Sequence, residues 1–185
     1  MNILVNTADK RIVVRPDTTW ERDNEDLFLP EFVDAVSWSP VLFARVSKPG
    51  RSVGLKFADR YYDSVGYGVL LYPENMIDGS EAGYASACCL DHTSFLPAPL
   101  YEKKDVGGMF TLRADGEEIF SYSEGTADMI EKALCEATKF CYIRVGDLVA
   151  IELQSRKLLK DRKDGGSHLT GSFGMNDIID FNIIF

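Results

Sequence analysis

Residues 88–92 (Cys-Cys-Leu-Asp-His) contain the densest group of potentially reactive side chains: two thiols, a carboxylate and one of the chain's 2 histidines. A thiolate is a nucleophile and a soft-metal ligand, and a nearby cation lowers the pKa of a thiol. One interpretation is therefore a nucleophilic or soft-metal site formed by Cys88, Asp91 and His92. The other, which we favour, is that Cys88 and Cys89 are small apolar residues of a buried strand and that Asp91 begins a loop.

Composition limits the classes of partner. A length of 185 residues with 45% apolar residues suits one domain with its own core, so we expect a single domain over residues 1–185. The formal net charge of −9 disfavours nucleic acid and membrane partners, because their phosphates would repel it. No apolar run approaches the ~20 residues of a membrane-spanning helix. No secretory signal is visible, and the 4 cysteines lack C-x-x-C spacing, so we expect reduced thiols and a cytoplasmic location.

One helix is predicted, over residues 127–140, where apolar residues recur at helical spacing. Thr126 is its expected N-cap, because a hydroxyl there accepts an otherwise unpaired backbone N–H. Upstream, residues 109–114 and 117–122 alternate as strands around Asp115-Gly116. That pair suits a type I′ hairpin, whose two central residues must both tolerate positive φ.

Short segments with turn signals predict strands through most of the remaining chain. Residues 155–176, rich in basic residues and glycine, are predicted to form one long loop; its cations could also form a patch for an anionic ligand. Many short strands with one main helix favour a mainly β (α+β) roll or sandwich over an alternating α/β fold. The predicted strands are 11–15, 41–46, 66–71, 85–90, 109–114, 117–122, 147–153 and 177–185.

Several short motifs occur in a particular order along the chain, and in that order they resemble the fumarylacetoacetate hydrolase (FAH) family. Residues 112–117, 126–130 and 143–149 are similar to the hairpin, the helix start and the last strand of the family's catalytic domain. Residues 56–63 resemble a segment of one branch of it. These segments read Leu-Arg-Ala-Asp-Gly-Glu, Thr-Ala-Asp-Met-Ile, Ile-Arg-Val-Gly-Asp-Leu-Val and Lys-Phe-Ala-Asp-Arg-Tyr-Tyr-Asp, with weaker likenesses at 15–18 and 29–32.

The resemblance implies an FAH-like mixed β roll or sandwich and metal-assisted cleavage or rearrangement of β-diketo and oxo acids. In that family, Mg²⁺ or Mn²⁺ is bound by a Glu-x-Glu pair on one strand and an Asp on a later strand. Residues i and i+2 share a face, so both oxygens of the pair reach one hard cation. The metal stabilises an enolate, a His–Glu dyad on a lid activates water, and a Lys supports the oxyanion. The family also suggests a homodimer.

The family's functional positions carry other residues in this sequence. The three metal positions fall on Ser39, Val41 and Leu70, none of which supplies the anionic oxygen that Mg²⁺ or Mn²⁺ prefers. No Glu-x-Glu pair occurs anywhere in residues 33–84. The Lys position falls on Cys88 or its neighbour, and the lid segment keeps neither its His nor its Glu.

These substitutions predict an FAH-family scaffold that has lost its chemistry. We therefore expect a non-catalytic protein, a pseudoenzyme, that binds a small organic acid or a partner chain and uses no metal cofactor. The alternative is a divergent hydrolase, isomerase or decarboxylase acting on an oxo or β-diketo acid. Its ligands would come from positions that the motifs do not mark, or its chemistry from Cys88 and His92.

Overall fold

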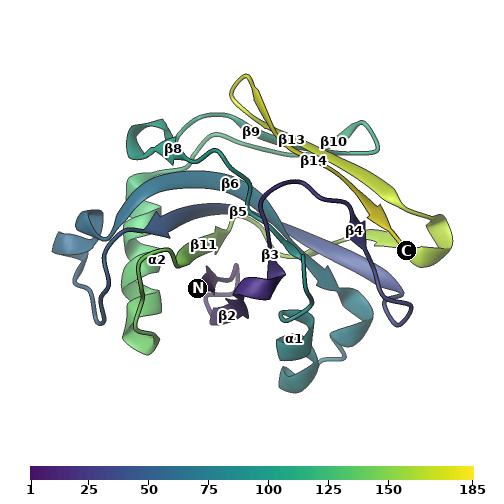
Figure 1. The fold of residues 1–185 in the computed structure, drawn as a ribbon, viewed down its shortest axis with the longest axis horizontal. Helices are drawn as coiled ribbons and strands as arrows, with labels where there is room; N and C mark the ends of the chain where they lie inside the picture. The colour runs from purple at the N-terminus through teal and green to yellow at the C-terminus, as the bar shows by residue number, and fades with distance from the viewer.

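Two β-sheets form the body of the protein in the computed structural model, which describes residues 1–185 (Figure 1). Apolar side chains from both sheets fill the space between them. The structure is thus mainly β with few helices, which confirms the predicted α+β roll or sandwich. No helix in it is both long and apolar enough to cross a bilayer.

The elements divide between the sheets as follows. The larger sheet contains β1 (Asn2–Asn6), β2 (Ile12–Pro16), β3 (Trp20–Glu21), β5 (Ala35–Val46), β6 (Tyr62–Pro73), β7 (Ser94–Phe95), β8 (Tyr101–Glu102), β11 (Leu148–Glu152) and β12 (Lys157–Asp161). The smaller sheet contains β4 (Leu27–Phe28), β9 (Phe110–Ala114), β10 (Glu117–Tyr122), β13 (Ser167–Phe173) and β14 (Asn176–Ile184). The helical segments are α1 (Glu81–Ala87), α2 (Ala127–Phe140) and the 3₁₀ turns η1 (Asp17–Thr19), η2 (Leu55–Arg60), η3 (Glu74–Met76), η4 (Lys103–Asp105) and η5 (Arg162–Asp164).

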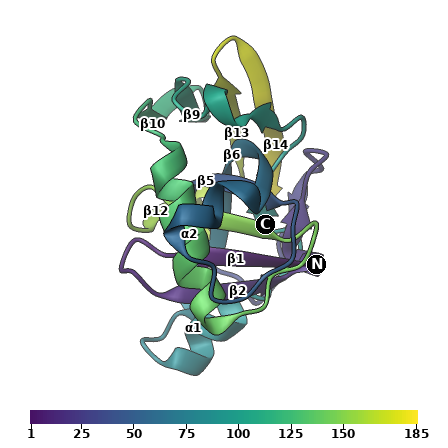
Figure 2. The same ribbon diagram turned by 90° about the vertical axis from the view of Figure 1, so that its left-hand side faces the viewer.

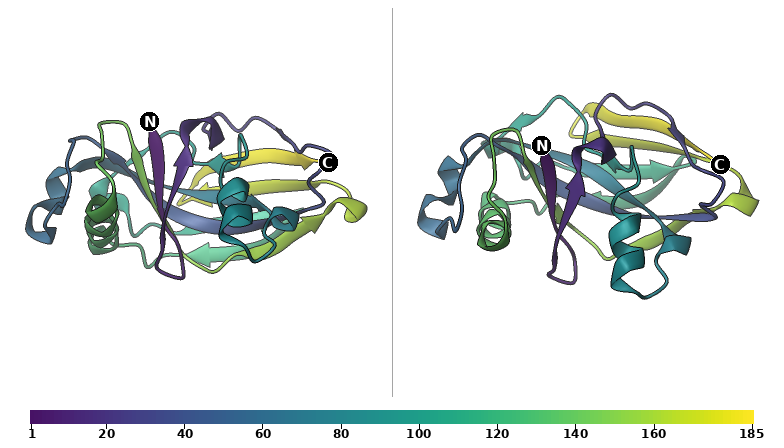
Figure 3. Two further views of the ribbon diagram at one scale, coloured as in Figure 1. Left: turned by 90° about the horizontal axis from the view of Figure 1, so that it is seen from below. Right: turned by 60° about the horizontal axis from the view of Figure 1, so that its bottom comes forward.

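The larger sheet curls into a roll on the side turned away from the smaller sheet, where β1, β2, β3 and α1 lie (Figures 1 and 3). Its strand order is β2-β1-β11-β5-β6-β7-β3, with β12 beside β5 and β8 beside β6. Arg15 on β2, at one end of this order, reaches β7 near the other end, because its Nη1 donates to Ser94 Oγ at 3.0 Å. Apolar side chains from β1, β5, β6 and β11 fill the interior of the roll as a second core.

The long strand β5 carries a proline near its middle, which a central strand normally excludes. Pro40 is tolerated because β12 pairs with β5 only as far as Trp38, and β11 begins to pair at Val41. Between them β5 has no ladder partner on that side, although the Leu153 N–H donates to the Pro40 carbonyl at 2.9 Å. The chain leaves β11 through this gap, so residues 153–156 pass beside the interior of the roll.

The predicted helix and hairpin are confirmed. α2 spans the expected residues and lies along one side of the molecule (Figure 2). Thr126 Oγ1 accepts the Met129 N–H at 3.3 Å, so the N-cap is formed as expected. β9 and β10 pair around Asp115 (φ 52°) and Gly116 (φ 86°), as the type I′ turn requires. The predicted strands 11–15, 41–46, 66–71, 147–153 and 177–185 correspond to β2, β5, β6, β11 and β14.

The strand predicted at 85–90 is wrong, because those residues end the helix α1. Ser80 caps this helix by accepting the Gly83 N–H at 3.0 Å, and Cys88 stands at its carboxyl end. Seven residues are too short to display a helical period clearly, so the cap was the only local signal. Cys88 and Cys89 therefore do not alternate across a strand.

The long loop predicted at 155–176 is also wrong, since β12 and β13 occupy much of it. β13 alternates buried and more exposed residues, but its inward positions include Ser167 and Gly171, which hide the apolar period. A Cβ at Gly171 would lie 2.8 Å from Leu112 Cδ2 on β9 and 3.2 Å from Ile179 Cβ on β14, so a larger residue there would displace these side chains. His168, expected in that loop, lies on β13 and bonds to Asp180 at 2.7 Å. β1 was not among the predicted strands.

Candidate functional site

The three positions that the resemblance assigns to metal ligands lie together inside the roll. Ser39 on β5 is directly opposite Leu70 on β6, and Val41 follows two residues later on the same face. All three are fully buried, with 0% of their surface exposed. Val41 and Leu70 pack in the second apolar core, which also contains Phe43, and the Ser39 hydroxyl donates to the Gln154 carbonyl at 2.8 Å.

This donor set does not fit a hard divalent cation. Mg²⁺ and Mn²⁺ are held by carboxylate, carbonyl and water oxygens, whereas Val41 and Leu70 present only hydrocarbon. The hydroxyl of Ser39 is neutral and already hydrogen-bonded. Elsewhere in the chain, no group of three or more His, Cys, Asp or Glu side chains is arranged to hold a metal ion.

A buried cation of the chain itself lies beside these positions. Arg15 is fully buried and donates from Nη2 to the Leu71 carbonyl at 2.9 Å and from Nη1 to the Thr93 carbonyl at 3.1 Å. Its Nη1 also reaches Ser94, which is the strand partner of Leu70. No carboxylate pairs with this guanidinium, and its Nε has no hydrogen-bond partner. Hydrogen bonds to neutral acceptors therefore hold a positive charge in the interior of the roll.

The buried ring of Tyr72 lies close to this buried cation and to a second arginine, Arg156, which lines an open cavity. The Arg15 guanidinium lies 4.3 Å from the ring centre of Tyr72, and that of Arg156 lies 5.6 Å from it. The Tyr72 hydroxyl donates to Glu152 Oε1 at 2.6 Å, and the other oxygen of Glu152 accepts the Ala8 N–H at 2.9 Å. Burial raises the pKa of Tyr72 well above its usual value, so its hydroxyl stays protonated and acts as a donor.

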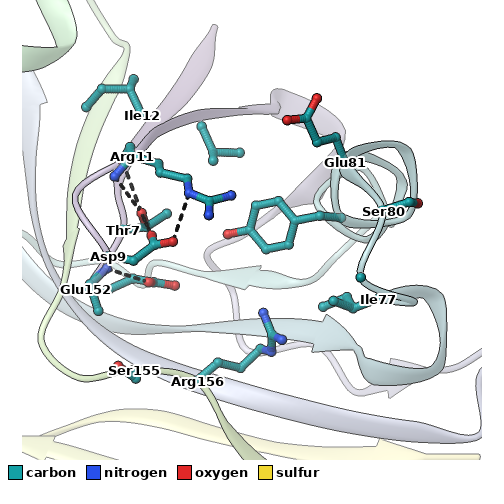
Figure 4. A pocket seen from close by; sticks show the side chains of 14 residues that line it. Thr7, Asp9, Arg11, Ile12, Ile77, Ser80, Glu81, Glu152, Ser155 and Arg156 are labelled. Atoms are coloured by element: carbon teal, nitrogen blue, oxygen red, sulfur yellow. Dashed lines mark hydrogen bonds and ion pairs between the residues drawn. The ribbon is translucent and has the colours of Figure 1, made fainter.

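The cavity has a volume of about 640 Å³ and opens between the β1–β2 turn, the start of α1 and residues 152–156 (Figure 4). Tyr84 projects into it, and burial raises the pKa of Tyr84 to about 12. Arg11 and Arg156 reach in from opposite walls. Arg11 Nε pairs with Asp9 at 2.9 Å and Arg156 Nε with Glu74 at 3.0 Å.

Each of these two arginines has donors to spare. Arg11 and Arg156 engage protein carboxylates through Nε alone, so their Nη groups form no hydrogen bond within the chain. The carboxylates of Asp9 and Glu152 are already bonded, to Arg11 and Thr7 and to Tyr72 and Ala8 respectively. The arrangement can therefore donate hydrogen bonds to an anionic group placed over Tyr84.

Solved structures of other proteins match this chain over its whole length. An FAH-family protein from Yersinia pestis superimposes with a TM-score of 0.82 at 15% identity, covering 99% of this chain and 92% of that one. The fumarylpyruvate hydrolase of Pseudomonas aeruginosa, solved with Mn²⁺ and pyruvate, gives 0.80 at 15% identity, covering 100% and 90%. The fold is that of the fumarylacetoacetate hydrolase family.

The 2-hydroxyhepta-2,4-diene-1,7-dioate isomerase of Mycobacterium marinum shares the FAH fold as well, with a TM-score of 0.81 at 13% identity over 99% of this chain and 74% of that one. At such identities the likeness establishes the FAH fold and not the activity. No family model matches the sequence, and no curated protein matches it.

Of the three residues that the sequence marked as pocket candidates, the structure keeps Asp91 and His92 together and sets Cys88 apart. Cys88 is buried in the second core, and burial raises the pKa of its thiol. Asp91 and His92 line a different cavity of about 380 Å³, and His92 Nδ1 lies 3.0 Å from Glu21 Oε2. Cys88 and His92 are thus not placed for a shared nucleophilic step.

The cavity residues Arg11 and Tyr84 were missed by reasoning from the sequence, whereas Arg156 belongs to residues 155–176, whose cations were considered as a patch for an anionic ligand. Arg15 entered that reasoning only as part of a motif, and nothing in its spacing marked it as buried. The end of β11 and the residues after it contribute Glu152 and Ser155 to the cavity wall.

Proposed function

We propose that this chain is an FAH-like binding protein that takes a small organic acid in the cavity over Tyr84 and performs no metal-dependent chemistry. The observation that carries the proposal is the pairing of an apolar interior at Val41 and Leu70 with two arginines whose Nη groups are free. The acid would lie outside the roll, over Tyr84, rather than on a metal within it.

The unengaged Nη donors, and not the net charge of the cavity, support a small anionic ligand. Arg11 and Arg156 line the cavity together with three carboxylates, those of Asp9, Glu81 and Glu152, but Asp9 and Glu152 already have protein partners. A carboxylate ligand would accept charge-assisted hydrogen bonds from the free Nη groups, and these are stronger than neutral ones. A flat acid would also contact the Tyr84 ring.

The proposal is tested by titrating the protein with pyruvate and with oxaloacetate in a calorimeter, with and without added MgCl₂. We expect saturable binding of at least one acid that does not depend on the metal. Arg156→Gln and Arg11→Gln should each weaken it about 10–100-fold, the cost of one charge-assisted hydrogen bond. Arg113→Gln removes an exposed arginine outside the cavity and should leave binding unchanged.

Two results would contradict the proposal. One is binding of neither acid. The other is turnover of oxaloacetate that requires Mg²⁺, which would favour the alternative of a divergent hydrolase or decarboxylase. Loss of binding in Arg113→Gln as well as in the cavity variants would show that the effect is not local.

A further inference from the structure

One end of the molecule exposes an unusual number of large apolar side chains. η2 packs against α2 there, and the loop that leads into η2 is held to the last turn of α2 (Figures 1 and 2). Phe140 is 69% exposed, Val145 65% and Phe57 46%, whereas side chains of these types are usually buried in the core of a domain. Together with Leu55 and Tyr142, these residues form what we call the α2–η2 end.

The segments of this end are held together by backbone hydrogen bonds, so the exposed side chains belong to one ordered surface. Gly50 and Ile143 exchange two hydrogen bonds, of 3.1 and 2.9 Å. The Ser52 N–H donates to the Thr138 carbonyl at 2.8 Å, and the Val53 N–H donates to Thr138 Oγ1 at 3.1 Å. The loop before η2 is thereby fixed to the last turn of α2.

The same end concentrates positive charge in a chain that is acidic overall. Residues 48–60 and 139–145 contain six Lys or Arg and a single acid, Asp59, a net charge of +5; the rest of the chain therefore carries −9 − 5 = −14. Lys139 is paired with Glu136, but the other five cations form no salt bridge. These five are Lys48, Arg51, Lys56, Arg60 and Arg144.

The cations surround the apolar side chains instead of standing apart from them. The Lys56 ammonium lies 5.8 Å and the Arg60 guanidinium 5.4 Å from the ring centre of Phe57. None of the five cavities with volumes of about 640, 580, 520, 380 and 360 Å³ is lined by residues of this end. A protruding apolar tip ringed by free cations suits a broad anionic surface better than a peptide that needs a groove.

We propose that the α2–η2 end docks reversibly on bilayers that contain anionic lipid. Its aromatic side chains would enter the headgroup level, and its free cations would contact lipid phosphates and carboxylates. The negative net charge of the chain disfavours membrane partners only if that charge is evenly distributed. A net charge of +5 in residues 48–60 and 139–145 would instead attract this end of the protein to anionic lipid. The acidic remainder of the chain would orient this end towards the bilayer.

The test is co-sedimentation of the full chain with phosphatidylcholine vesicles, with and without phosphatidylserine. We expect binding that requires phosphatidylserine and weakens with added salt. Lys56→Gln with Arg60→Gln should reduce it by about fivefold for each cation removed. Phe57→Ser with Phe140→Ser should reduce it further, and circular dichroism would check that this variant is folded.

The matched control is Phe28→Ser with Phe32→Ser, two aromatic residues that are 71% and 57% exposed and lie among acidic residues near β4. This control should bind vesicles as the wild type does. Absence of binding to phosphatidylserine vesicles, or equal loss in the control and the Phe57/Phe140 variant, would overturn the proposal. A third result would also overturn it. If the wild type does not bind vesicles but is a dimer by light scattering, and the Phe57/Phe140 variant is a monomer, then this surface joins two copies of the chain.

Discussion

Replacing Leu70 by aspartate puts one of the family's carboxylates back where the resemblance places it, and it should strongly destabilise the protein. Leu70 is fully buried in the apolar interior of the roll. Losing its side chain should cost about 2–5 kcal/mol, as for other buried leucines cut short. Burying the carboxylate adds a desolvation cost of several kcal/mol, because the side chain at position 70 lies in an apolar core and the guanidinium of Arg15 already donates to other acceptors.

The matched variant Leu70→Asn separates the charge from the loss of packing. Burial disfavours the charged form, so the pKa of the new aspartate in the folded state should lie above its unfolded value of about 3.9. A group whose folded pKa is raised loses stability as pH rises between the two values, by about 1.4 kcal/mol per pH unit. Leu70→Asp and Leu70→Asn should therefore be similar near pH 4 and diverge above it.

Urea unfolding of both variants at about pH 4 and about pH 8 measures this difference. We expect the aspartate variant to be the less stable by several kcal/mol at the higher pH. Equal stability at both values would refute the reasoning, since it would mean that the interior at Leu70 is wet or supplies a partner for the charge. Leu158→Asp, at a position 58% exposed, should show little dependence on pH and serves as the exposed control.

Three further predictions concern other parts of the structure. Tyr72→Phe removes the 2.6 Å bond to Glu152 and should cost about 1.5–3 kcal/mol in urea unfolding; no loss would mean that the bond is replaced by water. Iodoacetamide at pH 8 should modify exposed Cys89 well before buried Cys88, whose thiol pKa is raised by burial; peptide mass spectrometry reads the order, and equal rates would show that the core opens easily. Thr126→Ala should cost about 1 kcal/mol and Thr126→Ser much less, because only the alanine lacks the capping hydroxyl; equal unfolding midpoints would contradict the cap.

Local signals in the sequence were enough where an element carries its own start, stop and period. α2 has a capping threonine and a full apolar stripe, so its bounds could be predicted. The hairpin at Asp115-Gly116 could be predicted equally well, because only a few residue pairs tolerate the backbone angles of its turn. The strand at β13 was not, since small inward residues erase the alternation on which such predictions depend.

The candidate site was less accessible from the sequence, because it depends on contacts between distant segments. The placement of Ser39, Val41 and Leu70 on one face followed from the resemblance, and the β5–β6 register brings these positions together. The burial of Arg15 and its hydrogen bonds could not be predicted from the sequence. Arg15 bonds to Leu71, Thr93 and Ser94, which only the curling of the sheet brings to β2.

The most direct test of the account is a titration of the wild-type protein with Mn²⁺, followed by the electron paramagnetic resonance signal of the free ion. Because Val41 and Leu70 offer hydrocarbon where the family's carboxylates would stand, we predict only weak, salt-sensitive loss of the signal to surface carboxylates. Stoichiometric binding of one Mn²⁺ that resists salt and is abolished by Ser39→Ala would contradict the account.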